Sequence, residues 1–449
     1  MRHLNLFSRS RVLAFSRSRV LAFMFWAIQS REARRASHCL PRAPPKPRNA
    51  RTPERENART RERENVVMRH LKAMPSLWGR VLTGGHELPP SRVEVADGRI
   101  VGLYPAPRPE AGDLVVEDGW IAPGLIDLQV NGAGGADLTS AAEPPTALTR
   151  VAETLARHGV TAFCPTVISS PPDVILDRLA AYAPRTVRGG AESLGVHVEG
   201  PFIDPDHRGI HDASVLRPAS REEIARWLDR GAPIIVTLAP ERPGGLNAIH
   251  QLIAAGVTVS LGHSGADVAA TRNALEAGAR LGTHLFNAMP PLHHRQPGLV
   301  GALLASHAVV GLIADGVHLD PLVVDLVVRR CGADRVVLVS DAVAAAGAAP
   351  GDSALGDQTV VSDGRSVRRA DGTLAGGAML LDGCLRNLRA WLPDLAPATL
   401  VKMATHTPAG LLGVARKGRV AVGCDADLIV LDDELNILRT LVRGEHEPD

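Results

Sequence analysis

The sequence predicts an α/β fold class, a (β/α)8 barrel of the TIM type with a small β-sandwich domain built from both chain ends. Two observations lead to this prediction. Strand-like apolar runs alternate with amphipathic helical stretches through the middle of the chain, and short alternating strands occur towards both of its ends. A chain of 449 residues is long enough to bury the core of such a barrel together with an accessory unit.

The first part of the chain differs in composition from the rest. Residues 1–73 carry 18 Lys and Arg against five Asp and Glu, and the segment Phe7–Ala14 is repeated at once as Phe15–Ala22. Such a basic, low-complexity segment buries too little apolar surface to fold, so we expect disorder. A targeting leader and a nucleic-acid or membrane-binding arm are alternatives. We favour an over-extended start, with synthesis beginning at Met68 or Met74.

The composition of the remaining chain limits the class of protein. From residue 74 onward, Asp and Glu outnumber Lys and Arg by 43 to 32, which argues against a surface that binds nucleic acid. The five cysteines are scattered without paired spacing, which is typical of a reducing compartment. No apolar run reaches the roughly 20 residues that a membrane-spanning helix needs. We therefore expect a cytoplasmic protein with neither a membrane nor a nucleic-acid partner.

The small β-domain is expected from residues 74–121 and 414–449. Alternating strands on either side of Asp97-Gly98 have the pattern of a β-hairpin. Ala426–Asp432 has the pattern of another strand, far along the chain. Strand patterns on both sides of a long α/β region predict that the two chain ends share one β-unit.

Residues 122–413 are expected to form the catalytic barrel. Amphipathic stretches such as Thr146–His158 and Pro321–Arg330 separate its strand-like runs. Barrel enzymes place their chemistry at the carboxyl ends of the strands. The eight strand-like runs end near Gln129, Pro165, Glu199, Leu238, His263, Leu285, Ala314 and Ser340.

Three of these strand ends carry side chains that bind metals. Glu199, His263 and His284 each follow a short apolar run directly. A glutamate and two histidines form the ligand set of an open divalent-metal site that leaves one position for water. A single core histidine or salt-bridged glutamate would be unremarkable, and the coincidence of three favours metal. Asp341 ends the eighth run, where it is either a general base or a helix N-cap.

Several phrases of the sequence resemble the N-acetylglucosamine-6-phosphate deacetylases, a family of the amidohydrolase superfamily. The resemblance runs from Ala122 to about Asp432 and implies the same barrel fold. The most specific phrase is the long one around Asn287, whereas a single HxE or GHS triplet would be weak. The matching phrases are Pro123-Gly-Leu-Ile-Asp-Leu-Gln-Val-Asn-Gly132, His197-Val-Glu-Gly-Pro201, Gly262-His-Ser264, Thr283-His-Leu-Phe-Asn-Ala-Met-Pro-Pro291, His294-Arg-Gln-Pro-Gly298 and Asp315-Gly-Val-His318.

The resemblance implies a role for each candidate site residue. It assigns Glu199, His263 and His284 to a divalent metal ion, expected to be Zn²⁺ with Fe²⁺, Mn²⁺ or Co²⁺ as alternatives, and it makes Asp341 the catalytic base. Arg295 is implied to pair with the substrate phosphate, as a guanidinium suits that geometry. The substrate contacts that the resemblance implies are Ile210, His211, Asn287, Ala288, Arg295, Asp315, His318, Leu374, Ala375 and Gly376.

Two departures from common patterns bear on the metal count and on the substrate. Gln129 and Asn131 stand where many amidohydrolases carry a His-x-His pair for a second metal, and amides are poor zinc ligands, so we expect one ion per subunit. Arg208 stands at a position often held by lysine, and the two side chains are not interchangeable in hydrogen-bond geometry. This difference leaves the sugar preference open.

The expected activity is removal of acetate from N-acetyl-D-glucosamine 6-phosphate, giving D-glucosamine 6-phosphate in amino-sugar catabolism and cell-wall sugar recycling. The resemblance further implies a homodimer, with the phosphate-pairing arginine acting across the interface. Three alternatives remain open. They are the galactosamine 6-phosphate isomer as substrate, a related N-acyl-amino-acid deacylase or cyclic amidase, and a catalytically dead phosphosugar-binding protein.

Overall fold

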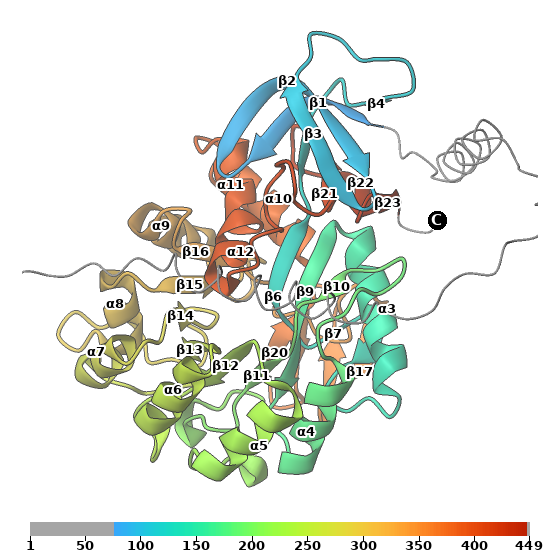
Figure 1. Cartoon of the computed structure of the whole chain (residues 1–449). Helices are drawn as coiled ribbons and strands as arrows, with labels where there is room; N and C mark the ends of the chain where they lie inside the picture. The colour runs from blue at the N-terminus through green and yellow to red at the C-terminus, as the bar shows by residue number, and fades with distance from the viewer. Residues whose placement is uncertain (1–75, 447–449) are drawn as a thin grey trace, which may run out of the picture. The chain divides into compact units, whose positions relative to one another are not determined.

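The computed structural model of the chain describes residues 76–446 (Figure 1). The predictions made for residues 1–73 therefore lie outside the described residues. None of the described helices is both long and apolar enough to cross a membrane.

Eight parallel strands form the barrel. Each neighbours the next in chain order, β6 pairs with β9, and a parallel bridge between Val130 and Ala342 joins β6 to the segment that follows β16. A short additional strand, β10 (Glu192–Ser193), pairs with β9. The barrel strands are β6 (Leu125–Val130), β9 (Val160–Ile168), β11 (His197–Glu199), β12 (Ile235–Leu238), β13 (Thr258–Leu261), β14 (Leu281–Gly282), β15 (Val309–Leu312) and β16 (Val336–Leu338).

Helices cover the outside of this barrel (Figure 1). Helix α5 shows why they form where they do. The Ser220 side chain accepts a hydrogen bond from the Glu223 amide as an N-cap, and Ile224 and Trp227 bury one face. Trp227 stacks on Phe202, with ring centroids 5.1 Å apart. The helices are α3 (Pro144–Arg157), α4 (Pro172–Ala181), α5 (Arg221–Gly231), α6 (Gly245–Ala254), α7 (Val268–Glu276), α8 (Gly298–Ala305), α9 (Pro321–Cys331), α10 (Leu381–Trp391), α11 (Pro397–Met403) and α12 (His406–Leu412), with short 3-10 turns at Pro205–His207 and Ala213–Val215.

Both ends of the described chain build one further sheet, which appears above the barrel in Figure 1. Its hairpin turns at Asp97 and Gly98, whose φ angles of 50° and 72° suit a two-residue β-turn. The sheet has an apolar core of its own that includes Leu77, Ile100 and Leu428. Its strands are β1 (Leu77–Thr83), β2 (His86–Ala96), β3 (Arg99–Pro105), β4 (Leu114–Val115), β5 (Trp120–Pro123), β21 (Leu428–Leu431), β22 (Ile437–Val442) and β23 (Glu445–His446).

The predicted fold class is thus confirmed as a barrel with a small β-unit drawn from both chain ends. The domain boundaries proposed from the sequence, 74–121 with 414–449 and 122–413, stay predictions. A buried ion cluster lies where the two parts of the chain meet. The Lys417 ammonium is 2.6 Å from an Asp427 carboxylate oxygen beside β21 and 3.1 Å from one of Glu192 on β10. The cluster therefore links the terminal sheet to the barrel.

A small antiparallel sheet was not predicted. Substrate contacts were expected at Leu374, Ala375 and Gly376, and the structure has these residues in the last of four strands that follow β16. The Gly356 amide in its first turn donates to the Asp137 carboxylate, at 3.2 Å, which fastens the sheet to the barrel rim. Its strands are β17 (Gly351–Leu355), β18 (Gln358–Ser362), β19 (Ser366–Arg368) and β20 (Leu374–Gly377), and the rim strands are β7 (Gly132–Ala133) and β8 (Ala136–Asp137).

Candidate active site

The candidate site lies at the carboxyl ends of the barrel strands. Glu199 is the last residue of β11, and His263, His284 and Asp341 follow β13, β14 and β16 within three residues. The last three have positive φ angles of 50°, 25° and 48°, which residues with a Cβ rarely adopt. Such backbone strain is found mostly at functional sites, where the surrounding structure holds it in place.

The three predicted metal ligands meet at this end of the barrel. Each offers one ligand atom, and these atoms all lie within 4.8 Å of one another. The Glu199 Oε1 atom is 3.2 Å from His284 Nε2 and 3.4 Å from His263 Nε2. The two Nε2 atoms are 3.1 Å apart. All three side chains are buried.

These distances fit a divalent metal ion. Ligand atoms about 2.0–2.2 Å from a tetrahedral ion lie roughly 3.4 Å from each other. The His263 Nδ1–H donates to the His207 carbonyl at 3.0 Å, which leaves the Nε2 lone pair facing the cluster. The Nε2 atom of His284 faces the same point, 3.1 Å from His263 Nε2. Two imidazole lone pairs at 3.1 Å repel unless a cation or a proton lies between them.

The charge of Glu199 also suits a cation site. Burial alone would raise the pKa of this carboxyl, but the adjacent His263 and His284 rings outweigh it and hold the pKa well below its usual range. Gln129 Nε2 donates to Oε1 at 2.8 Å. Glu199 is therefore an ionised carboxylate inside a barrel, and a buried anion of this kind needs a cationic partner.

Asp341 is placed to act as a base beside this cluster. Asn131 Nδ2 donates to its Oδ1 at 2.7 Å, which leaves Oδ2 as the oxygen free to take a proton. Burial, followed by the nearby Glu199 charge, raises the pKa of Asp341 to about 6. A base with its pKa close to neutral is well matched to accept a proton and return it.

Two further predicted histidines line the same cavity, each held by a neighbour. Burial lowers the pKa of His211 to about 3, so its ring is neutral, and its Nδ1 lies 2.7 Å from the Ser169 hydroxyl. His318 Nδ1 is 2.7 Å from an Asp315 oxygen, and the same carboxylate accepts the Val317 and His318 amides. The structure thus places Asp315 behind His318, as the residue that orients its ring.

The cavity over the cluster has a volume of about 240 Å³. Of the residues predicted from the sequence, Asp315 and Arg295 do not line it. Arg295 is exposed, on the loop before α8. Five further residues line the cavity, Asn131, Ile168, Gly209, Leu355 and Thr373. The sequence pointed to Asn131 through the missing second metal and to Thr373 through the segment that it begins, whereas Ile168, Gly209 and Leu355 carried no signal. The predicted residues that line the cavity are Glu199, Ile210, His211, His263, His284, Asn287, Ala288, His318, Asp341, Leu374, Ala375 and Gly376.

Comparison with known proteins decides the family. Residues 120–446 match the model of the Amidohydrolase family. This chain belongs to the amidohydrolase family. Members of this family depend on metal, which agrees with the Glu199, His263 and His284 cluster.

The amidohydrolase resembles deacetylases of amino-sugar phosphates. It is 39% identical to the N-acetylglucosamine-6-phosphate deacetylase of Danio rerio, over 73% of this chain and 84% of that protein. It is 35% identical to the N-acetylgalactosamine-6-phosphate deacetylase of Escherichia coli O157:H7, over 82% of this chain and 97% of that one. The N-acetyl-D-glucosamine-6-phosphate deacetylase of Mycobacterium smegmatis, solved in complex with N-acetyl-D-glucosamine-6-phosphate, superimposes with a TM-score of 0.77 at 32% identity, over 84% of this chain and 100% of that one.

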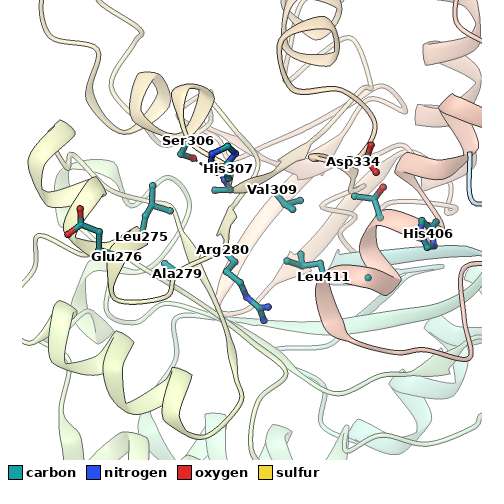
Figure 2. Close-up of a pocket in the computed structure, with 13 residues that line it drawn as sticks. Leu275, Glu276, Ala279, Arg280, Ser306, His307, Val309, Asp334, His406 and Leu411 are labelled. Atoms are coloured by element: carbon teal, nitrogen blue, oxygen red, sulfur yellow. Dashed lines mark hydrogen bonds between the residues drawn. The ribbon is translucent and has the colours of Figure 1, made fainter. Parts of the chain in front are cut away.

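A larger cavity lies at the opposite end of the amidohydrolase barrel (Figure 2). It has a volume of about 700 Å³. Arg280, Val309 and Asp334 on its wall lie at or just before the starts of β14, β15 and β16, and His406 begins α12. Barrel enzymes carry their chemistry at the carboxyl ends of the strands, so size alone does not make this cavity the active site.

The raised pKa of Asp341 predicts an acid limit to hydrolysis. The carboxyl must be ionised to accept a proton, so the rate should fall as the pH drops through about 6 and the group becomes protonated. A bound divalent cation favours the ionised form, so it moves this limit lower and never higher. The measurement is kcat/KM against pH, with circular dichroism showing that the protein stays folded. An acid limb well above pH 6 would contradict the assignment of Asp341 as the base.

Proposed function

We propose that this amidohydrolase removes acetate from N-acetyl-D-glucosamine 6-phosphate, giving D-glucosamine 6-phosphate. The observation that carries the proposal is the cluster of Glu199, His263 and His284 with Asp341 beside it, in the cavity at the carboxyl ends of the barrel strands. The deacetylases to which the chain is similar support the choice of an amino-sugar phosphate. Amino-sugar catabolism and cell-wall sugar recycling in the cytoplasm are the setting that we propose for it.

The residues divide the chemistry between them. A metal ion held by the three ligands would lower the pKa of water and polarise the acetyl carbonyl. Asp341 accepts the proton of the attacking water on Oδ2, because Asn131 occupies Oδ1, and then delivers it to the departing nitrogen. We propose that His318, oriented by Asp315, and the neutral His211 hydrogen-bond the substrate, one at the phosphate-bearing sugar and the other at the acetamide end.

We propose one Zn²⁺ ion per subunit. A His-His-Glu ligand set with an open position suits catalytic zinc, while Fe²⁺, Mn²⁺ and Co²⁺ accept the same donors. Gln129 and Asn131 supply amide donors to Glu199 and Asp341 at the positions where a second ion would need ligands. Their engagement in these hydrogen bonds supports a single ion.

The phosphate and the sugar would be bound by the remaining cavity residues. Asn287 and Ala288 present a loop near the metal ligands, where the Ala288 φ of 51° marks a tight turn. Ile210 and the β20 segment Leu374–Gly376 line the cavity and would border the sugar. Arg295 is exposed and does not line the cavity of its own protomer. We therefore propose that it pairs with the phosphate in a second copy of the chain, within a homodimer.

Replacement of Asp341 by Asn should abolish most turnover and leave substrate binding intact. The amide cannot accept the proton of water, and losing a positioned acid–base group costs about 100- to 10,000-fold in rate. Acetate release from N-acetyl-D-glucosamine 6-phosphate measures this, and calorimetric binding to the inactive variant provides the control. A fully active Asp341→Asn enzyme would refute the mechanism.

The same assay separates the rival functions. Faster acetate release from N-acetylgalactosamine 6-phosphate would favour that sugar as the substrate. The similarity to the Escherichia coli O157:H7 protein and the arginine at position 208 are the observations that favour this alternative. Equal turnover of an N-acyl-amino acid would point to a general deacylase. Substrate binding without acetate release by the zinc-loaded wild-type enzyme would indicate a phosphosugar-binding protein.

Replacement of Arg295 by Met should raise KM for the phosphorylated sugar at least about tenfold and change kcat little. A charge-assisted contact to phosphate contributes roughly 1.5–3 kcal/mol, and this one lies away from the reacting amide. Unphosphorylated N-acetylglucosamine is the matched substrate, since its KM should not depend on Arg295. Mixing Arg295→Met with Asp341→Asn protomers should regain activity if the arginine acts across an interface. An unchanged KM for the phosphorylated sugar would exclude Arg295 from phosphate binding.

A further inference from the structure

A buried histidine below the candidate site has no part in the proposed chemistry. His197 lies on β11 two residues before Glu199, so both side chains point into the barrel. Its side chain is nearly inaccessible, with only 1% of the residue exposed. Both ring nitrogens have partners. Nδ1 is 3.0 Å from the Leu128 carbonyl, and Nε2 is 2.8 Å from the Thr237 hydroxyl.

The contacts continue from Thr237 through two more buried hydroxyls. Thr237 Oγ1 lies 2.7 Å from Thr283 Oγ1, which in turn contacts the Ser260 hydroxyl. We call His197, Thr237, Thr283 and Ser260 the buried chain. Thr237 and Ser260 are completely inaccessible, and Thr283 is 2% exposed.

The hydrogen bonds of the buried chain run in one direction. The Leu128 carbonyl can only accept, so His197 Nδ1 carries the hydrogen, and in the neutral ring Nε2 accepts. Thr237 must then donate to Nε2, and its oxygen accepts from Thr283. Thr283 in turn accepts from Ser260. Every donor and acceptor is thereby assigned, which fixes the relative position of the strands that carry them.

These strands are the ones that deliver the metal ligands. His197 shares β11 with Glu199, Thr283 directly precedes His284, and Ser260 lies three residues before His263. Thr237 on β12 stands between β11 and β13 and bridges them. A shift of any of these strands along its neighbour would break one of the hydrogen bonds and move one ligand.

Burying a layer of polar side chains at this depth in a barrel carries a free-energy cost. Barrel interiors are usually filled with bulky branched apolar side chains, which need no partners. Buried hydroxyls and imidazoles cost free energy unless each one is hydrogen-bonded, and a network that is satisfied throughout rigidifies its surroundings. Apolar residues would fill the space without that risk, so the layer calls for a purpose other than packing.

We propose that the buried chain is the positioning layer of the metal site, which holds Glu199, His263 and His284 at the spacing that a divalent ion needs. The proposal rests on the metal site of the proposed function but not on its substrate. Its members are positioning residues and touch neither the ion nor the sugar. Without them the strand ends would keep their ligands but lose the fixed distances of 3.1–3.4 Å between ligand atoms.

The decisive variant is Thr237→Val, which replaces the central hydroxyl by a methyl group of similar volume. It leaves His197 Nε2 and Thr283 without their partner. In the full-length protein, the Zn²⁺ dissociation constant from competition with a chromophoric chelator should rise about 10- to 100-fold, as expected for lost outer-shell support. The visible absorption of the Co²⁺ form should change in shape. Thr237→Ser keeps the hydroxyl and should restore both.

Thr258→Val is the matched control. Thr258 is a buried threonine of β13 that is not a member of the buried chain, so its loss should leave Zn²⁺ affinity and the Co²⁺ spectrum unchanged. Should Thr237→Val not fold, Ser260→Ala removes only the last donor and should weaken Zn²⁺ binding in the same direction. The proposal would be overturned if Thr237→Val and Ser260→Ala left the Zn²⁺ affinity unchanged, or if Thr258→Val lowered that affinity equally. Failure of the wild-type protein to bind Zn²⁺ would instead contradict the metal site itself.

Discussion

The structure depends on one electrostatic constraint at the carboxyl end of the barrel. A buried carboxylate and two imidazole nitrogens lie 3.1–3.4 Å apart, and the His263 ring is turned so that its lone pair faces inward. A metal ion or a proton among these groups makes such an arrangement favourable, because like lone pairs repel and an isolated buried anion is expensive. The rest of the site is arranged around satisfying this constraint.

The strands on either side of the cluster contribute to that arrangement in different ways. Strand β6 contributes hydrogen-bond donors, since Gln129 holds Glu199 and Asn131 holds Asp341. Asp127 on the same strand accepts from the Ser340 hydroxyl at 2.5 Å, and burial raises its pKa to about 7. It thereby fixes the residue that precedes the proposed base. The small sheet β17–β20 borders the cavity and contributes Leu355, Leu374, Ala375 and Gly376 to its wall.

Much of this site could be predicted from the sequence because its strongest signals are local. An apolar run ending in Glu199, His263, His284 or Asp341 marks both a strand and the residue at its carboxyl end, and parallel strands in a barrel bring those ends together. The hydrogen bonds of Gln129 and Asn131 were not predictable in this way. Their partners lie 70 and 210 residues away, so only the closed barrel reveals that these amides act as donors.

Other features were missed for different physical reasons. The strands β17–β20 are short and partly exposed, and their stretch is rich in glycine and charged residues, so it lacks the periodicity that marks a buried strand. The exposed position of Arg295 agrees with the expectation of a role across an interface, but that expectation came from the resemblance, because the sequence of one chain carries no signal for contacts with a second copy. The motif Asp315-Gly-Val-His318 has the same sequence whether Asp315 contacts the substrate or orients the His318 ring. Only the geometry distinguishes these two roles.

The central claim is that Glu199, His263 and His284 hold one divalent ion, and the metal content of the purified protein tests it most directly. After saturation with Zn²⁺ and removal of free metal, elemental analysis should find one ion per subunit in the wild-type protein and almost none in Glu199→Gln. Gln keeps the shape of the side chain but loses the charge that the ion requires. A Glu199→Gln protein that retains the wild-type metal content, or a wild-type protein that retains none, would contradict the account.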